Sequence, residues 1–180
     1  MESSNSVFTT TLQAHLCVKL LAVLVLITSY TAGIRAQTVN ADFSGTWVYN
    51  ESKSSPVEGN FRMAPGKLVV TQNGISLAVE RTSSGPNGDI VSNDKFTTDG
   101  NECTNTMLGD NTRKSTVKYS PDGRSLLFSH YMKFEMQGQT MEMTNTETWK
   151  INDAGNSLSV ETVFNSPDGE MRTTNVYDKK

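Results

Sequence analysis

The feature that most restricts how this chain can fold is a series of short turn signals from residue 73 onward. The series includes Asn73-Gly74, Asp99-Gly100, Gln137-Gly138 and Pro167-Asp168-Gly169. Short runs rich in threonine, valine and aromatic residues lie between the signals, and none of them keeps a helical period. Such spacing is typical of antiparallel strands that follow one another through tight turns. We therefore predict an all-β fold.

The turn signals divide the chain into ten expected strands. Their ranges are 43–50, 66–72, 75–82, 89–98, 101–108, 112–119, 124–136, 139–151, 157–165 and 170–178. An antiparallel up-and-down meander of 8–10 strands most easily closes into a barrel, because closure removes the exposed sheet edges. A two-sheet sandwich is the alternative. Residues 51–65 lack a strand pattern, and we expect either a connector or a flap over the barrel opening.

A two-residue loop fixes the register of the strands on either side of it, so each turn predicts which residues face each other. Asn73-Gly74 places Val70 opposite Leu77. The expected loop over 120–123 places Val117 opposite Leu126. The loop over 166–169 places Leu158 opposite Tyr177, and Asp99-Gly100 places Phe96 opposite Cys103. Each register gathers apolar residues on one face, which we expect to be the barrel interior.

The stretch from His130 to Met143 holds four of the eight methionines of the chain. With Gln137-Gly138 as its loop, one face carries the pairs Phe134/Met141, Met132/Met143, His130/Asn145, Phe128/Glu147 and Leu126/Trp149. The other face carries Lys133 opposite Glu142, which marks it as the solvent side. The methionines are therefore expected to point inward together with His130, Asn145 and Glu147.

The three inward polar residues are more informative than the methionines, because methionine is a common filler of protein cores. A buried imidazole, amide and carboxylate are unfavourable unless they are paired or hydrated. They indicate a ligand cavity with polar anchors, or an internal hydrogen-bond network without a ligand, or a metal site. In the first case the ligand-binding residues are His130, Asn145, Glu147, Phe128, Met132, Met143, Phe134 and Tyr177.

The metal alternative would use His130, Met132 and Met143, because thioether and imidazole ligands suit Cu(I). His130 is the only histidine after residue 36, so a zinc site with several histidines is excluded for that part of the chain.

Residues 1–36 differ from the rest of the sequence. An apolar run over 20–27 follows Lys19 and precedes the small residues Thr31, Ala32 and Gly33. The run is short for a membrane span and fits a signal peptide, with cleavage expected after Ala36. An uncleaved membrane anchor is the alternative. We therefore expect a single domain over 37–180, in a secreted or periplasmic protein that has no transmembrane segment in its mature chain.

Composition excludes several other classes of function. The formal net charge of −3 and the lack of a basic run argue against nucleic acid as a partner. Neither a nucleophile-elbow motif nor a phosphate-binding glycine loop is found, so we expect no cofactor and no enzyme. Acid-base chemistry at His130 and Glu147 is the one exception considered. Cys103 is the only cysteine after residue 36, which excludes a disulfide within residues 37–180, and we expect a monomer.

The run Phe43 to Asn50, FSGTWVYN, resembles the first strand of the calycins, the group of lipocalins and fatty-acid-binding proteins. The ending NVYDKK and the run Thr146 to Trp149, TETW, are similar to those of bacterial exported lipocalin-like domains. The Asp-Gly turn at Asp99-Gly100, which follows the run FTT over 96–98, is also similar to a turn in those domains. The resemblance covers residues 43–180 and implies a lipocalin-like barrel whose end Trp47 closes. That bacterial family has no well-established activity, so the resemblance bears on fold more than on function.

One position departs from the fatty-acid-binding pattern. That pattern implies an inward arginine two residues before a tyrosine on the last strand, where it holds a carboxylate. Here Asn175 precedes Tyr177, and Arg172 falls on the opposite face in the expected register. Binding of a fatty acid in that manner is therefore not expected, and Tyr177 is either a ligand contact or a packing residue.

Three functions follow in order of preference. The first is an exported, non-catalytic barrel that holds a small apolar or amphipathic molecule in its interior. The second is a filled-core structural or interaction module on the cell surface or in the periplasm. The third is a periplasmic carrier of Cu(I).

Overall fold

The computed structural model of the chain describes residues 39–56, 64–107, 111–136, 139–166 and 169–180. The predicted signal peptide over 1–36 and part of the expected connector over 51–65 lie outside the described residues. In the described ranges, no helix is long and apolar enough to cross a membrane.

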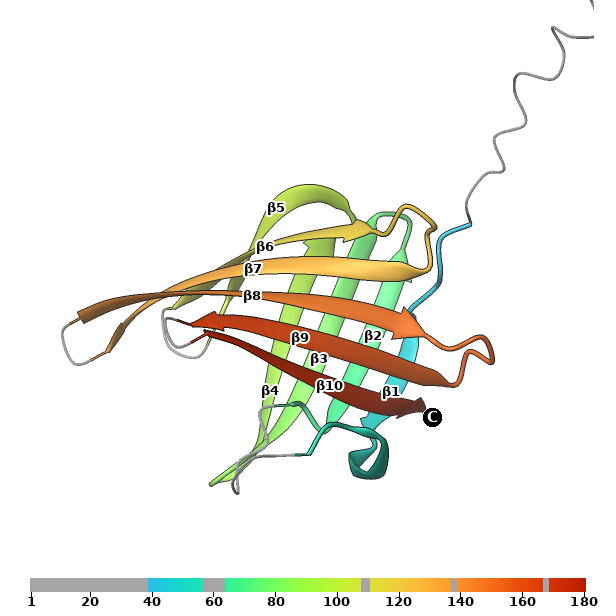
Figure 1. Cartoon of the computed structure of the whole chain (residues 1–180), viewed down its shortest axis with the longest axis horizontal. Coiled ribbons are helices and arrows are strands. Elements are labelled where there is room, and N and C mark those ends of the chain that lie inside the picture. The colour runs from blue at the N-terminus through green and yellow to red at the C-terminus, as the bar shows by residue number, and fades with distance from the viewer. Residues whose placement is uncertain (1–38, 57–63, 108–110, 137–138, 167–168) are drawn as a thin grey trace, which may run out of the picture. The chain divides into compact units, whose positions relative to one another are not determined.

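The described residues form ten antiparallel strands in one sheet (Figure 1). The elements are β1 Gly45–Tyr49, the short 3-10 helix η1 Glu51–Lys53, β2 Lys67–Asn73, β3 Ser76–Gly85, β4 Gly88–Thr97, β5 Asp99–Thr106, β6 Thr112–Tyr119, β7 Ser125–Met136, β8 Gln139–Ile151, β9 Ser157–Ser166 and β10 Gly169–Lys179. The predicted all-β meander is confirmed, and its ten strands fall within a few residues of the expected ranges.

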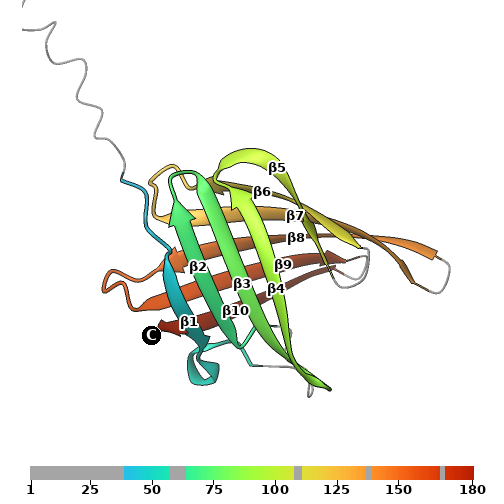
Figure 2. The same cartoon turned by 180° about the vertical axis from the view of Figure 1, so that it is seen from behind.

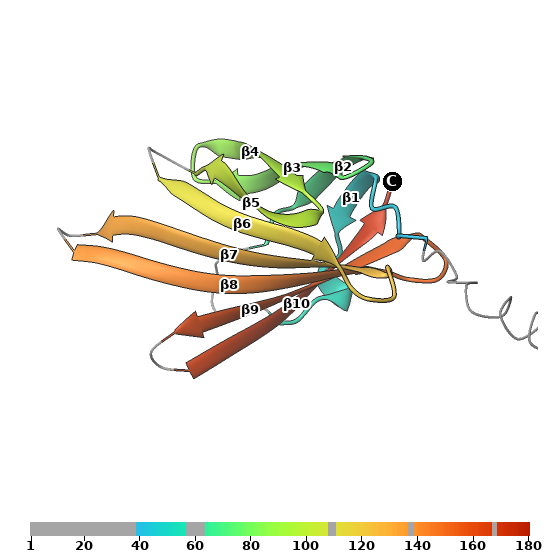
Figure 3. The ribbon, with the colours of Figure 1, turned by 90° about the horizontal axis from the view of Figure 1, so that it is seen from above.

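The sheet curls until its two ends approach each other. The strand order is β4-β3-β2-β1-β10-β9-β8-β7-β6-β5, so β4 and β5 are the edges although they are consecutive in the chain. Figures 2 and 3 show β2–β4 facing β7–β10 across the interior, with β5 and β6 on one side. The result is a nearly closed up-and-down barrel, as predicted.

Period-two alternation builds the core of this barrel, because every second residue of a strand points inward. Buried side chains from most of the strands meet in one cluster; they are Phe43, Trp47, Leu68, Val70, Leu77, Val79, Phe96, Val117, Leu126, Phe128, Trp149, Leu158, Val160 and Tyr177. The largest of these burials each contribute roughly 1.5–3 kcal/mol to folding.

Two of the predicted registers are confirmed and two are shifted. In the β7–β8 pair His130 faces Asn145, and in the β9–β10 pair Leu158 faces Tyr177, both as expected. In contrast, Val70 faces Val79 rather than Leu77, and Val117 faces Phe128 rather than Leu126. Each shift is two residues, which exchanges partners but leaves every side chain on its predicted face.

The expected hairpin at Asp99-Gly100 is wrong. Phe96 does not face Cys103 in a strand ladder, because β4 and β5 are the unpaired edges of the sheet. A different set of contacts joins them. The Asn105 side chain of β5 accepts a hydrogen bond from the Lys95 backbone N–H at 2.7 Å and donates one to the Lys95 carbonyl at 3.0 Å. The Thr97 N–H also contacts Cys103 Sγ at 3.3 Å.

The buried Asn105 amide thus takes the place of a strand partner at this seam. We expect Asn105→Ala to lower the free energy of unfolding by about 1–3 kcal/mol, because it leaves the Lys95 N–H and carbonyl without that partner. Chemical denaturation measures the loss. Asn93→Ala is the matched control, since Asn93 is exposed on β4. Equal losses in the two variants would contradict the role given to Asn105.

The Gly45-x-Trp47 motif begins β1. Gly45 has a φ of 142°, and a Cβ there would lie 2.7 Å from Lys179 Cε, so the position favours glycine. Trp47 is fully buried, and its Nε1 donates to the Phe43 carbonyl at 3.0 Å. Lys179 Nζ lies 5.1 Å from the centre of the Trp47 ring. The motif therefore has a packing role where the first strand meets the last.

The described part of the connector after β1 is held by short-range polar contacts. Asn50 caps η1 by accepting from the Lys53 N–H at 3.2 Å and donates to Asp178 at 2.6 Å. Ser54 and Ser55 then accept hydrogen bonds from the backbone of β10. Whether the connector continues as a flap concerns residues outside the described ranges.

Candidate functional site

The β7–β8 hairpin carries the polar residues that the sequence singled out. His130 and Asn145 face each other across the two strands, with exposed fractions of 2% and 6%. Glu147 faces Phe128, and this pair lies two residues from the His130/Asn145 pair on the same face of the hairpin. The structure therefore brings together the three predicted polar anchors on the inner face of the sheet.

The Glu147 carboxylate is bound by groups from two sides of the barrel. Its Oε2 accepts from Trp149 Nε1 at 2.7 Å and lies 3.4 Å from Arg81 Nη2, which reaches it from β3. Burial acts to raise the pKa of Glu147, but the charge of Arg81 and the hydrogen bond from Trp149 outweigh it and hold the pKa below its ordinary value. Glu147 is therefore an ionised carboxylate at neutral pH.

Arg81 is one of three further charged residues beside these anchors. Its Nε lies 3.2 Å from Asp94 Oδ2, and the same oxygen lies 2.6 Å from Arg113 Nη2. Asp94 belongs to β4 and Arg113 to β6, so this ion pair crosses the seam between the sheet edges. The set Arg81, Asp94, Arg113, Ser115, His130, Asn145 and Glu147 is called the polar cluster below.

His130 is hydrogen-bonded to a hydroxyl on one side and faces a carboxylate, beyond hydrogen-bond distance, on the other. Its Nδ1 lies 2.8 Å from Ser115 Oγ, and its Nε2 lies 3.7 Å from Glu147 Oε1. Burial lowers the pKa of His130 to about 4, although Glu147 acts in the opposite direction. The imidazole is neutral at pH 7. The nearby carboxylate favours the tautomer with the proton on Nε2, and Ser115 then donates to Nδ1.

Three buried polar atoms of the cluster have no hydrogen-bond partner among the described residues. They are Arg113 Nε, His130 Nε2 and Asn145 Oδ1. They come from β6, β7 and β8, and Ser115, His130 and Asn145 occupy one row across these strands. A buried polar atom without a partner is unfavourable by about 1–3 kcal/mol. The three atoms therefore make up a set of hydrogen-bonding positions that the described protein groups leave unused.

Aromatic rings line the cluster on the side toward the core. Phe128 lies 5.5 Å from Phe96 and 4.9 Å from Trp149, measured between ring centres, and its ring stacks on His130 at 5.8 Å. The Arg81 guanidinium lies 5.4 Å from the Trp149 ring centre. Phe128 was predicted to contact the apolar body of a ligand; the structure places it in the buried core behind the polar cluster.

The other side of the cluster is apolar and more open. Beyond the His130/Asn145 pair, Met132 faces Met143 and Phe134 faces Met141. Met132, Phe134 and Met143 are partly buried, and Met141 is 41% exposed. These four residues are called the hairpin-tip residues. Burial falls toward the tip because β7 and β8 extend past the ladders they share with β6 and β9.

Tyr177 lies apart from the hairpin tip. It is buried in the core cluster and packs edge-on against Tyr49 with the ring centres 5.7 Å apart. Arg172 is exposed and pairs with Glu161 and Glu170 on the outside, as the expected register required. This placement agrees with the prediction of Tyr177 as a packing residue.

The metal alternative stays a prediction. The register puts Met132 and Met143 in the next pair on the same face as His130, as the copper hypothesis supposes. In the described ranges no group of three or more histidine, cysteine, aspartate or glutamate side chains could hold a metal ion. That finding bears on zinc-type and carboxylate sites and leaves a methionine-based site untested.

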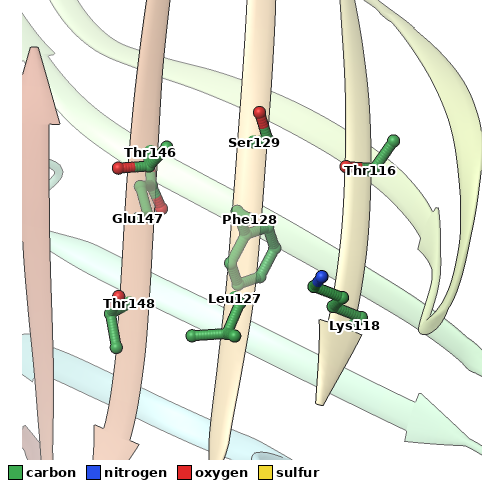
Figure 4. A pocket seen from close by; sticks show the side chains of 8 residues that line it. All are labelled: Thr116, Lys118, Leu127, Phe128, Ser129, Thr146, Glu147 and Thr148. Atoms are coloured by element: carbon green, nitrogen blue, oxygen red, sulfur yellow. The ribbon is translucent and has the colours of Figure 1, made fainter. Parts of the chain in front are cut away.

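A hollow lies mainly along the outer faces of three neighbouring strands. It has a volume of about 330 Å³ and is lined by Thr116, Lys118, Leu127, Phe128, Ser129, Thr146, Glu147 and Thr148. Figure 4 shows these residues on three neighbouring strands, β6, β7 and β8. Most of them alternate with the inward residues and thus face away from the interior. The hollow shares Glu147 with the polar cluster and Phe128 with the buried core.

Sequence reasoning missed Arg81, Asp94, Arg113 and Ser115. A signal for them was available, because each shares its strand face with residues that are plainly core. Arg81 follows Leu77 and Val79 at two-residue spacing, Asp94 precedes Phe96 by two residues, and Arg113 and Ser115 precede Val117 at the same spacing. The pattern does not predict that side chains from β3 and β4 meet side chains from β6 and β8. Those contacts depend on how the sheet curls.

No protein-family model matches the chain. No curated protein sequence matches it. Among solved structures, the chain is similar to the zebrafish ileal bile acid-binding protein in complex with cholic acid. The two are 19% identical, with 77% of this chain and 98% of that chain covered and a TM-score of 0.48. The kinship with bacterial exported lipocalin-like domains stays a prediction.

Proposed function

We propose that the protein binds a small amphipathic molecule inside its barrel. The polar head would meet the polar cluster, and the apolar body would lie along the hairpin-tip residues. The observation that carries the proposal is the set of three buried polar atoms without protein partners, beside partly exposed methionines. A ligand of this kind would satisfy both parts of the site at once.

The orientation follows from the direction in which burial changes along β7 and β8. The core-facing side of the polar cluster is filled by Phe96, Phe128 and Trp149, which leaves no room for a chain-like body there. The tip-facing side has Met132 and Met143, whose flexible thioether side chains adapt to irregular shapes. The apolar body would therefore extend toward the end of the hairpin, away from Trp47 and the core.

A neutral apolar dye tests this proposal. Nile red should bind the protein saturably, with an increase in emission, and Met143→Trp should weaken its binding by at least about tenfold, because the indole fills the space beside Met132. Thr144→Trp is the matched control, since Thr144 is exposed on the outer face of the same strand. Fluorescence titration gives both dissociation constants.

The opposite results would favour the second hypothesis, a barrel with a filled interior. Nile red would then fail to bind saturably, and native mass spectrometry of the protein would give the mass of the bare chain. Equal weakening by Met143→Trp and Thr144→Trp would place the dye outside the barrel and would also contradict the proposal.

We also propose that the protein acts outside the cytoplasm, as a monomer. The support for export is the apolar run over 20–27 behind Lys19, with small residues before the expected cleavage after Ala36. An N-terminus at Gln37 in protein recovered from the periplasm or the medium would agree with it, whereas an intact N-terminus there would not.

A further inference from the structure

The charges that face the barrel interior balance one another in the described residues. Arg81 and Arg113 supply two positive charges, and Asp94 and Glu147 supply two negative ones. His130 adds none at neutral pH. The remaining charged side chains of the flanking strands, such as Lys118, Lys133 and Glu142, are exposed on the outside.

This balance leaves no arginine free to neutralise an incoming anion. Arg81 is already shared between Asp94 and Glu147, and Arg113 is bound to Asp94 at 2.6 Å. A carboxylate head brought to the cluster would add one uncompensated negative charge to a buried site, and a buried unpaired charge is strongly unfavourable. An ammonium head would add one uncompensated positive charge, with the same difficulty.

The unpartnered atoms, in contrast, match an uncharged head. Arg113 Nε–H and His130 Nε2–H are donors, and Asn145 Oδ1 is an acceptor. A hydroxyl group can accept from one of the donors and donate to the asparagine oxygen at the same time. A head that only accepts, such as an ether or a ketone, would leave Asn145 Oδ1 unsatisfied.

We infer that the molecule held in the barrel has an uncharged head that both donates and accepts hydrogen bonds, such as a primary alcohol, rather than a carboxylate. This inference rests on the proposed function and specifies the ligand class for the same site. It follows from the ion pairs of this chain, in which two arginines are matched by two carboxylates.

The test compares three ligands that share one apolar chain and differ in their heads: dodecan-1-ol, dodecanoate and dodecylamine. Each competes with Nile red for the full-length protein at neutral pH. We expect dodecan-1-ol to bind at least about tenfold more tightly than either charged ligand. Equal or tighter binding of dodecanoate would overturn the inference while leaving the proposed function intact. Failure of Nile red and of all three ligands to bind would overturn both.

A charge variant provides the second measurement. Glu147→Gln keeps the side-chain shape and leaves the cluster with one excess positive charge, so the affinity for dodecanoate relative to dodecan-1-ol should rise at least about tenfold. Glu142→Gln, on the exposed face of the same strand, is the control and should change nothing. Asp94→Asn makes the same change of charge from β4 and replaces Glu147→Gln if that variant does not fold. An unchanged ratio in a folded variant would overturn the inference.

Discussion

Asp94→Leu is expected to lower the free energy of unfolding by about 3–5 kcal/mol. Asp94 is 4% exposed and is bound by two arginines whose side chains are 12% and 14% exposed. Removing its charge leaves Arg113 buried without a carboxylate, and removal of one partner from a buried ion pair is strongly destabilising. Urea or guanidinium denaturation measures the loss.

A double variant separates the effect of charge from that of packing. Asp94→Leu together with Arg113→Met removes one charge of each sign and leaves Arg81 paired with Glu147. We expect the double variant to be more stable than Asp94→Leu alone, since well-packed apolar replacements of a buried pair are often nearly neutral. Asp89→Leu, an exposed position on β4, is the control. If the double variant lost the sum of the two single losses, the ion pair would not be the source of the effect.

The second large effect is a loss of stability in mild acid. The pKa of His130 is about 4 in the folded protein, against an ordinary value of 6.5. Between these values the unfolded chain takes up a proton that the folded protein does not bind. The free energy of unfolding should therefore fall as the pH is lowered from about 6.5 to about 4, by an amount on the order of 3 kcal/mol.

The contribution of His130 to the pH dependence of stability can be distinguished from that of the carboxylates. Asp42, Glu147 and Asp178 have pKa values below their ordinary ones, so the stability they provide is present above the ordinary carboxyl range and is lost only as the pH falls through and below it. The change in the free energy of unfolding between pH 6.5 and about 5 is therefore attributed to His130. His130→Gln should flatten the stability profile in that interval.

His130 is the only histidine after residue 36, so no second imidazole contributes once residues 1–36 are removed as proposed. Ser129→Gln, at an exposed position of the same strand, is the control and should leave the pH profile of the wild-type protein unchanged. Denaturant titrations at a series of pH values give the profile. A flat wild-type profile between pH 6.5 and 5, or a His130→Gln profile as steep as that of the wild type, would contradict the burial of a neutral imidazole.

Much of the fold could be predicted because its signals are local. A Gly-containing turn sets where two strands meet, and alternation sets which face of each strand is apolar. For β7–β8, both signals lie within 27 consecutive residues, and the predicted pairs His130/Asn145 and Phe128/Glu147 are confirmed. Where the loop was misjudged, as between β2 and β3, the error was a shift of two residues and the faces were retained.

The hairpin wrongly expected at Asp99-Gly100 has a different origin. The turn residues are those of a hairpin, but the flanking strands are the two edges of the sheet and pair with other strands. Their mutual contact uses the Asn105 amide instead of a ladder, and the Asp94–Arg113 ion pair beside it joins β4 to β6. Closure of the barrel, a property of all ten strands together, decides how these two segments meet.

Local signals in the sequence are enough to predict the number of strands, the faces of the strands and the inward position of His130, Asn145 and Glu147, because turn chemistry and period-two alternation act over a few residues. The residues that contact these three side chains depend instead on how the whole sheet folds. Arg81 reaches Glu147 from a strand more than sixty residues away, and Asp94 meets Arg113 across the seam. The curl and tilt of the whole sheet set those distances, and with them the charge balance of the interior.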